Sequence, residues 1–262
     1  MKRLGVWLAR AALLTGLTMP GAALSADSIT VTMGGLVLRP GTHALPAGAR
    51  LSDASVAAQV RVDAWFLGGA LLRQSAIAPQ QKLKAGVLFD LQSNRVHWQA
   101  ENKPAGVELA NRLLLAVELM PVTGRVPAQL DPLQQLALSR NALLEPGDHI
   151  LYPHRAEHVR VTGAVQMDCV LYFDPAWQPM DYLKQCPRHE LADPSFAHVI
   201  QPDGHARRRG VAVWNREPAA VAAGAVLYVP VAEQHLAGES PSFNEDFVAL
   251  LATQYTLGGR FE

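Results

Sequence analysis

Hydrophobic and polar residues alternate in two widely separated stretches of the chain, which is the pattern of a strand with one buried face. These stretches are residues 29–37 and 158–165. A shift of 128 positions places like residues on each other: Gly35 on Gly163, Val37 on Val165, and Asp53 on Asp181. The sequence therefore predicts an internal structural repeat.

Each copy of the repeat passes through a turn and a second strand into a helix, and then closes with an apolar strand. The closing strands follow a glycine turn and stop at Pro153 and Pro230, because proline cannot continue a hydrogen-bonded ladder. A hairpin followed by a helix and further strands packs one helix across one face of a small mixed sheet. This arrangement is a β-grasp fold.

The helices of the two copies carry different signals. In the first copy Asp53 stands near the helix start, and apolar residues at helical spacing continue through Val56, Val60 and Leu67. In the second copy Pro179 occupies the first turn, where a helix tolerates proline.

Two further helical regions lie outside the repeat. A segment of about residues 78–122 interrupts the first copy, with helical spacing over 80–92 and 107–120 and a polar turn at 102–106. The chain finishes with an apolar helical stripe over residues 241–257, which we expect to dock on its own domain. A contact helix for a membrane or partner protein is the alternative, although its polar face lacks the Lys and Arg of surface-binding helices.

The whole pattern predicts an α+β protein with two β-grasp domains, a helical pair inserted in the first, and a C-terminal amphipathic helix. Residues 155–157 form a linker too short for free tumbling, so we predict a fixed angle between the domains. The predicted divisions are a signal peptide at 1–25, the first domain at 26–157, the second domain at 158–235, and the C-terminal helix at 236–262.

The N-terminus has the three parts of a secretory signal peptide. Two basic residues precede an apolar stretch at 4–17, and Ala23 and Ser25 occupy the small-residue positions of a cleavage site. We therefore expect cleavage after Ser25 and a mature chain in the periplasm. An uncleaved anchor is the alternative, but Arg10 interrupts the stretch. No later segment is apolar enough to span a bilayer.

Charge gives no reason to expect nucleic acid as a partner. The chain has 23 basic and 23 acidic side chains, so its formal net charge is zero. The densest basic cluster, residues 207–209, follows a turn signal at 202–204. We expect a solvated hairpin there.

Cys169 and Cys186 are the two cysteines of the chain. In an oxidising compartment a pair more naturally forms a disulfide than a closed zinc site, which needs four ligands. Two buried, unpaired thiols are the alternative, because a sequence does not show whether two Cα atoms approach within about 7 Å.

Residues 29–54, ITVTMGGLVLRPGTHALPAGARLSDA, are similar to the soluble-ligand-binding β-grasp (SLBB) module of bacterial polysaccharide export proteins. The shared pattern is a strand, a glycine, a Pro-Gly turn and an Asp-Ala helix start. With the signal peptide, second copy, helical insertion and C-terminal helix, the whole mature chain resembles the GfcC family of capsule-biosynthesis proteins. Residues 166–168 depart from the module, which argues against a ligand role for the second hairpin.

The resemblance implies a periplasmic accessory factor without enzymatic activity or cofactor, similar in domain structure to the periplasmic part of Wza-type exporters. Its implied partners are polysaccharide export or assembly proteins or the glycan itself, and the C-terminal helix is a candidate contact. The family's arginine in an exposed groove matches Arg125. Alternatively, Arg125 caps the carbonyl groups that end the preceding helix.

Two other functions stay open. A purely structural adaptor would stack its sheet edges against an exporter ring. A periplasmic enzyme that modifies or trims the polysaccharide would need two carboxylates about 5 to 10 Å apart across a cleft. Its candidates lie in the insertion and its flanks: Glu101, Glu108, Glu118 and Asp131. Since the chain has no Gly-x-Ser-x-Gly elbow and no P-loop, we predict no catalytic residues.

No metal site is predicted either. Residues 189–193 approach a zincin motif but end in Asp193 instead of a second histidine. Pro153 breaks any helix that would align His149, His154 and His158, and His149 and His158 belong to different copies of the repeat.

Exposed aromatic rings are the usual sign of a carbohydrate-binding surface. Trp65 lies in a helical stripe and Trp214 in an apolar strand, so both are expected in the core. Trp98 and Trp177 lie in less regular stretches and are the better candidates for exposure.

Overall fold

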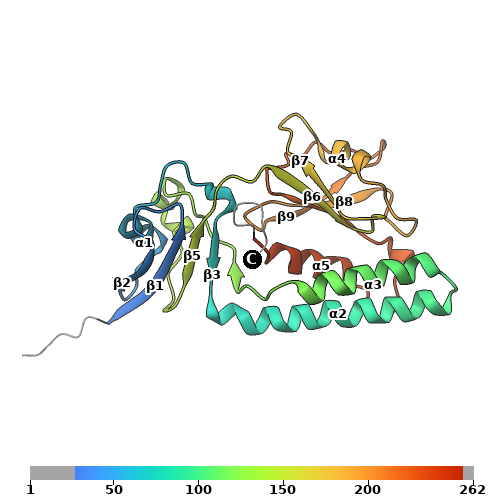
Figure 1. Cartoon of the computed structure of the whole chain (residues 1–262), viewed down its shortest axis with the longest axis horizontal. Coiled ribbons are helices and arrows are strands. Elements are labelled where there is room, and N and C mark those ends of the chain that lie inside the picture. Colours follow the sequence, from blue (N-terminus) through green and yellow to red (C-terminus); the bar gives the residue numbers. More distant parts are fainter. Residues whose placement is uncertain (1–26, 256–262) are drawn as a thin grey trace, which may run out of the picture.

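The computed structural model describes residues 27–255, which form two five-stranded mixed sheets, a long helical hairpin and a C-terminal helix. The sheets stand beside each other, and the hairpin runs under the second sheet (Figure 1). The predicted α+β class is confirmed. The predicted signal peptide at 1–25 lies outside the described residues.

The first sheet is made by the first copy of the repeat. Its strands are β1 Ser28–Gly35, β2 Gly41–Pro46, β3 Ala70–Leu72, β4 Arg125–Val126 and β5 His149–Tyr152. They lie in the order β2-β1-β5-β3-β4, and only β1 and β5 pair in parallel. Helix α1, Leu51–Ala58, packs into the core of this sheet.

The second sheet is made by the second copy. Its strands are β6 His158–Gly163, β7 Cys169–Tyr172, β8 Phe196–Ile200, β9 Ala206–Gly210 and β10 Val226–Val229. Their order, β7-β6-β10-β8-β9, matches the first sheet strand for strand, with β6 and β10 as the parallel pair. Helix α4, Pro179–Gln185, takes the place of α1. The predicted internal repeat is therefore confirmed.

The glycines and aspartates aligned by the repeat perform the same local tasks in both copies. Gly35 and Gly163 have φ of 78° and 96° at the ends of β1 and β6. A Cβ at either position would collide with a carbonyl oxygen of the neighbouring parallel strand, so only glycine fits without a shift. Asp53 and Asp181 each accept a backbone N–H three residues before them, at 2.7 and 3.0 Å, and so cap α1 and α4.

Helix α1 is shorter than its apolar spacing predicts. It ends at Ala58 because Gln59 adopts a left-handed backbone conformation, with φ of 53°. Val56 is 76% exposed, and Val60 instead forms an isolated bridge with Val37 of the loop after β1. The buried face consists of small residues and Leu51, so the prediction of a helical stripe from Val56 to Leu67 was wrong.

The inserted helical pair is present and longer than predicted. Helix α2 spans Ile77–Ala100 and α3 spans Pro104–Leu119, and together they form the helical hairpin. Although the pair is inserted in the first copy of the repeat, its buried side chains join the hydrophobic core of the second sheet. It crosses beneath that sheet, with α5 between the two (Figure 1).

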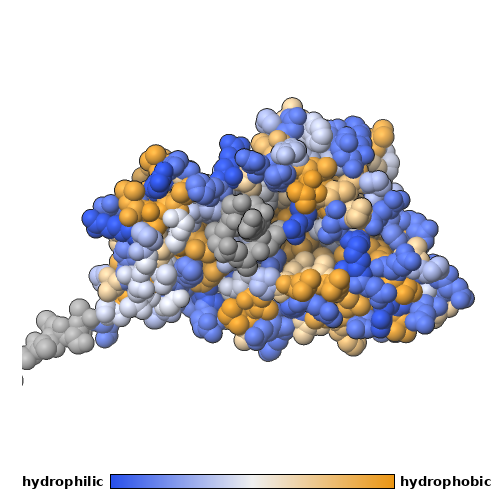
Figure 2. All heavy atoms as spheres, in the orientation of Figure 1, coloured by the Kyte–Doolittle hydropathy of each residue, from blue (hydrophilic) through white to orange (hydrophobic). Residues whose placement is uncertain are grey.

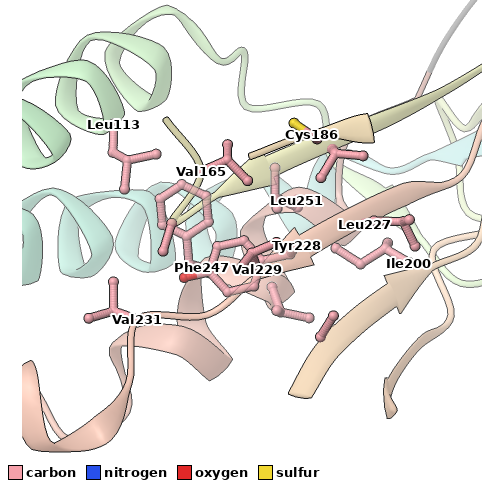
Figure 3. Close-up of a cluster of buried hydrophobic side chains, with 14 of the residues drawn as sticks. Leu113, Val165, Cys186, Ile200, Leu227, Tyr228, Val229, Val231, Phe247 and Leu251 are labelled. Atoms are coloured by element: carbon pink, nitrogen blue, oxygen red, sulfur yellow. The ribbon is translucent and has the colours of Figure 1, made fainter. Parts of the chain in front are cut away.

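Helix α5, Phe243–Ala252, docks on its own domain, as expected for the C-terminal stripe. Phe247 stacks on Tyr228 of β10 with ring centroids 5.1 Å apart, and Leu251 lies in the same cluster (Figure 3). The Tyr228 hydroxyl donates to Asn244 Oδ1 at 2.9 Å, which satisfies a buried polar group. The stripe's last predicted residue, Leu257, lies outside the described residues.

Both faces of the second sheet are covered. Because side chains alternate along a strand, Tyr228 faces Phe247 of α5, while its neighbour Leu227 lies on the opposite face in register with Val161 and Cys169. On the same side, a disulfide joins Cys169 of β7 to Cys186 at the end of α4, with Cα atoms 6.0 Å apart. None of the helices within residues 27–255 has both the length and the apolar content required to cross a bilayer.

The outer surface of the hairpin is partly apolar. Figure 2 shows hydrophobic atoms along its length, at the lower edge of the molecule. The exposed apolar side chains of the two helices are Phe89, Val96, Leu115 and Leu119.

Candidate functional site

Arg125 lies where the two sheets, the hairpin and the C-terminal segment meet. It belongs to the edge strand β4, and only 6% of the residue is exposed. Its guanidinium donates to the carbonyl oxygens of Gln254 at 2.6 Å and Gly69 at 3.1 Å, and to that of Pro202. One side chain thus connects the loop before β3, the turn between β8 and β9, and the residues after α5.

This position differs from both interpretations drawn from the sequence. The expected exposed groove is wrong, because Arg125 is buried under the turn at residues 201–205. The three carbonyl groups also belong to segments other than α3, so Arg125 does not cap the preceding helix. Burial lowers the pKa of Arg125 to about 10, and the nearby charge of Asp203 opposes that change. Arg125 therefore keeps its positive charge at neutral pH.

Other hydrogen bonds add to this meeting point of segments around Arg125, which we call the Arg125 joint. Gln80 of α2 donates to the carbonyl oxygen of Arg125 at 2.7 Å and accepts the N–H of Gly124 at 2.8 Å. Thr123 Oγ1 donates to the carbonyl oxygen of Thr253 at 2.7 Å. These bonds hold the start of α2 and the segment after α5 against β4. Sequence reasoning missed Gln80, because a polar residue in a helical stripe carries no sign of its partner.

A second contact between the sheets surrounds the linker. Arg155 lies over the ring of Trp65 at 4.7 Å from Cζ to the centroid, and 5.7 Å from the ring centroid of Phe173. Trp65 precedes β3 and Phe173 follows β7, so the cation joins aromatic rings of the two repeats. Trp65 is half-buried, and its backbone N–H donates to the carbonyl oxygen of Pro153 at 2.9 Å.

A cavity of about 210 Å³ lies beside the Arg125 joint, between the end of α3 and the α5 face of the second sheet. Its walls are mainly apolar, and the polar residues that line it are Arg160, Thr162, Asp168 and Gln254. Asp168 accepts hydrogen bonds from Arg112 at 2.5 Å and Thr162 at 2.8 Å. Burial lowers the pKa of Arg160, and the charge of Asp168 opposes the change.

The two halves of the chain match two models of one family. Residues 19–156 match "Capsule biosynthesis GfcC, N-terminal", and residues 169–256 match "Capsule biosynthesis GfcC C-terminal". The chain belongs to the GfcC capsule-biosynthesis family. The interval between the two matches, residues 157–168, contains β6, the first strand of the second repeat.

A curated relative of this GfcC-family chain is the "Uncharacterized protein YjbG" of Escherichia coli (strain K12). The two are 24% identical over 190 residues, which cover 72% of this chain and 76% of the relative. The similarity therefore extends across both sheets and is not confined to one copy of the repeat.

Two of the candidate carboxylates, Glu108 and Glu118, are too far apart to form a facing pair. Glu108 and Glu118 are ten residues apart on α3, which separates them by about 15 Å along the helix axis. Glu101 lies at the hairpin turn, paired with Lys103 at 2.7 Å, and Asp131 lies in the loop after β4. The distance on α3 exceeds the roughly 10 Å upper limit for glycoside cleavage.

The candidate metal ligands are also explained by local bonding. His189 Nε2 pairs with the carbonyl oxygen of Ala105 at 3.1 Å, and its Nδ1 accepts the N–H of Leu191. His158 stacks on Tyr172. Across the part of the chain that the structure describes, no three His, Cys, Asp or Glu side chains are grouped to hold a metal ion.

Two tryptophan expectations were wrong. Trp98 is fully buried, and its indole N–H donates to the carbonyl oxygen of His235 at 2.7 Å. Trp214 is 76% exposed, because β9 ends at Gly210 and the following residues form a surface loop. Trp177 is half-buried and meets Tyr182 edge-on at 5.1 Å.

Proposed function

We propose that the chain is a periplasmic accessory factor in the assembly or export of a capsule or exopolysaccharide. In this proposal it acts without catalysis, by binding the export machinery or the glycan. The observation that carries it is the match of both halves to the GfcC capsule-biosynthesis family, on a scaffold whose two sheets are joined by Arg125, Arg155 and the hairpin.

Two observations support the periplasm as the location. The N-terminal residues have the pattern of a cleavable signal peptide. Cys169 and Cys186 are joined by a disulfide, a bond that persists in oxidising compartments such as the bacterial periplasm.

In this proposal Arg125 serves binding indirectly. Its guanidinium holds the turn at 201–205 through the Pro202 carbonyl and holds the segment after α5 through Gln254. We expect it to fix the relative position of surfaces that touch a partner, since three of its hydrogen bonds already go to the protein's own backbone.

The first test is deletion of the gene, followed by measurement of surface polysaccharide and complementation with the full chain. We expect less polysaccharide at the cell surface, restored by the intact gene. Unchanged polysaccharide would contradict the proposed function.

The second test incubates the purified mature chain with the host's polysaccharide and follows its molecular mass. We expect no depolymerisation. Cleavage products that disappear in a Glu101→Gln, Glu108→Gln, Glu118→Gln or Asp131→Asn variant would make the chain an enzyme and overturn the accessory role.

A further inference from the structure

A groove of about 430 Å³ lies on the second sheet beside β9. Its floor contains Val199 of β8, and one wall is formed by Ala219 and Ala220. Its remaining lining is polar: Gln201, Asp203, His205, Arg207 and Arg209. The volume falls within the range of about 300 to 1,000 Å³ that is typical of small-ligand sites.

Strand register divides the three consecutive arginines of β9 between two faces. Arg207 pairs with Val199, and Val199 pairs with Leu227 on the α4 face of the sheet. Arg207 and Arg209 therefore extend on that face, into the groove. Arg208 extends on the other face, where its guanidinium lies 3.6 Å from the ring centroid of Phe196.

The charges in the groove leave one cation without a local counterion. Arg209 pairs with Glu217 at 3.1 Å, and His205 pairs with Asp203 at 3.1 Å. Within residues 27–255 the side chain of Arg207 has no ion pair or hydrogen bond, and it is exposed on the edge strand. The groove thus offers a free guanidinium above a small apolar floor.

One wall of the groove is rigidly held. The turn at 201–205 closes with the N–H of Gln201 donating to the carbonyl oxygen of His205 at 2.9 Å. Its Pro202 carbonyl accepts from Arg125 on the far side. The Gln201 side chain donates to the carbonyl oxygen of Ala220 at 2.8 Å, which ties the turn to the opposite wall. The concavity is therefore formed before any ligand arrives.

We propose that this groove binds an acidic saccharide unit, with its carboxylate on Arg207 beside Arg209 and the apolar face of its ring over Val199, Ala219 and Ala220. A guanidinium donates two parallel hydrogen bonds to a carboxylate, which gives both affinity and orientation. The small alanine wall leaves room for a pyranose ring. A concave floor of this size suits one sugar unit better than the flat, larger interface of a protein partner.

The test is calorimetric titration of the full mature chain with tetragalacturonate, with neutral maltotetraose, inorganic phosphate and a poly-glutamate peptide as comparisons. We expect tetragalacturonate to bind and maltotetraose to bind at least about tenfold more weakly, since a hydrogen bond to a charged group is worth about that factor or more. We expect phosphate and the peptide to bind no better than maltotetraose.

Arg208→Gln is a matched control for Arg207→Gln, because it removes the same charge from the adjacent residue on the opposite face. We expect Arg207→Gln to weaken tetragalacturonate binding at least about tenfold and Arg208→Gln to leave it within about twofold. Equal losses of binding in both variants would show that tetragalacturonate responds to the overall positive charge and not to Arg207, and would overturn the site. Binding of the peptide or of phosphate with the same dependence on Arg207 would overturn the saccharide assignment.

The inference rests on the proposed function only for the biological source of the glycan. Arg207-dependent binding of tetragalacturonate by a chain whose deletion leaves surface polysaccharide unchanged would refute the function and keep the groove. Loss of polysaccharide on deletion, full complementation by Arg207→Gln and no tetragalacturonate binding would refute the groove and keep the function.

Discussion

The two sheets share one strand order. They differ in the face that points away from α1 in the first sheet and away from α4 in the second. In the first sheet that face carries Thr30, Thr32 and Thr42 on β1 and β2, and the smaller Leu151 in the position equivalent to Tyr228. No helix of the described residues covers it (Figure 1). In the second sheet the equivalent face carries Tyr228 and is covered by α5 and the hairpin (Figure 1). A repeated fold thus acquires a different role when one copy supplies the cover for the other.

The same contrast extends to the start of the closing strands. Gly147 and Gly224 both have positive φ, and their N–H groups donate to equivalent residues of the parallel strand. Asp148 and Ala225, which follow them, therefore occupy equivalent positions in the two sheets. Asp148 is fully buried and paired with Arg73 at 2.8 Å, whereas Ala225 joins the apolar core. The first sheet depends on a buried ion pair where the second depends on hydrophobic burial.

Loosening the helical hairpin that covers the second sheet should have the largest effect on the free energy of unfolding. We expect Trp98→Ala to lower the free energy of unfolding by about 3–5 kcal/mol, because it empties a fully buried site and leaves the His235 carbonyl without its donor. Trp214→Ala is the matched control, and we expect a change within about 0.5 kcal/mol. Denaturant unfolding measures both, and equal losses would contradict the arrangement of the hairpin.

Breaking the ion pair of the first sheet should cost about 3 kcal/mol. In Asp148→Ala the Arg73 guanidinium stays partly buried without its main partner, although Glu145 at 3.1 Å still compensates in part. Asp63→Ala, which breaks the exposed Arg61 pair, is the control and should leave the free energy of unfolding almost unchanged. If denaturant unfolding gave similar losses for both, the buried pair would have no special role.

Opening the disulfide should cost about 2–3 kcal/mol, because it frees a loop of 17 residues in the unfolded chain. Cys169→Ser with Cys186→Ser in the mature chain would be compared with the oxidised and the reduced wild-type chain. We expect the double variant and the reduced chain to unfold at the same denaturant concentration, below that of the oxidised chain. No difference between oxidised and reduced chains would show that the bridge does not stabilise the second sheet.

Loss of the Arg125 joint should have the smallest effect on stability, about 2 kcal/mol, because three carbonyl groups lose one shared donor. Arg125→Met retains the length of the side chain. Arg39→Met, at an exposed position of the first sheet's loop, is the control and should be neutral. Unfolding curves test the energy, and equal curves for the two variants would contradict a structural role for Arg125.

The sequence predicted the repeat because glycine and aspartate requirements are local: a positive φ and a helix cap each depend on a few neighbouring residues. It predicted the existence of α2 and α3 from apolar spacing, but not the sheet they cover, since a stripe indicates a buried face and not its partner. Trp98 and Trp214 exchanged their expected environments for the same reason. Their exposure depends on the hairpin and on the end of β9, which are tertiary features.

The candidate site was predicted less completely. Arg125 was found through a family resemblance, but its burial comes from three segments distant in sequence. The arginines of residues 207–209 were correctly expected on a solvated hairpin. Their division between a groove and the opposite face depends on strand register, which the sequence alone left open.

Small-angle X-ray scattering of the mature chain tests the central claim, that the hairpin, Arg125 and Arg155 join the two sheets into one rigid body. We expect a single arrangement of the sheets to fit the wild-type curve, and we expect Arg125→Met to broaden the distribution of distances. A wild-type curve that required a wide spread of domain orientations would contradict it.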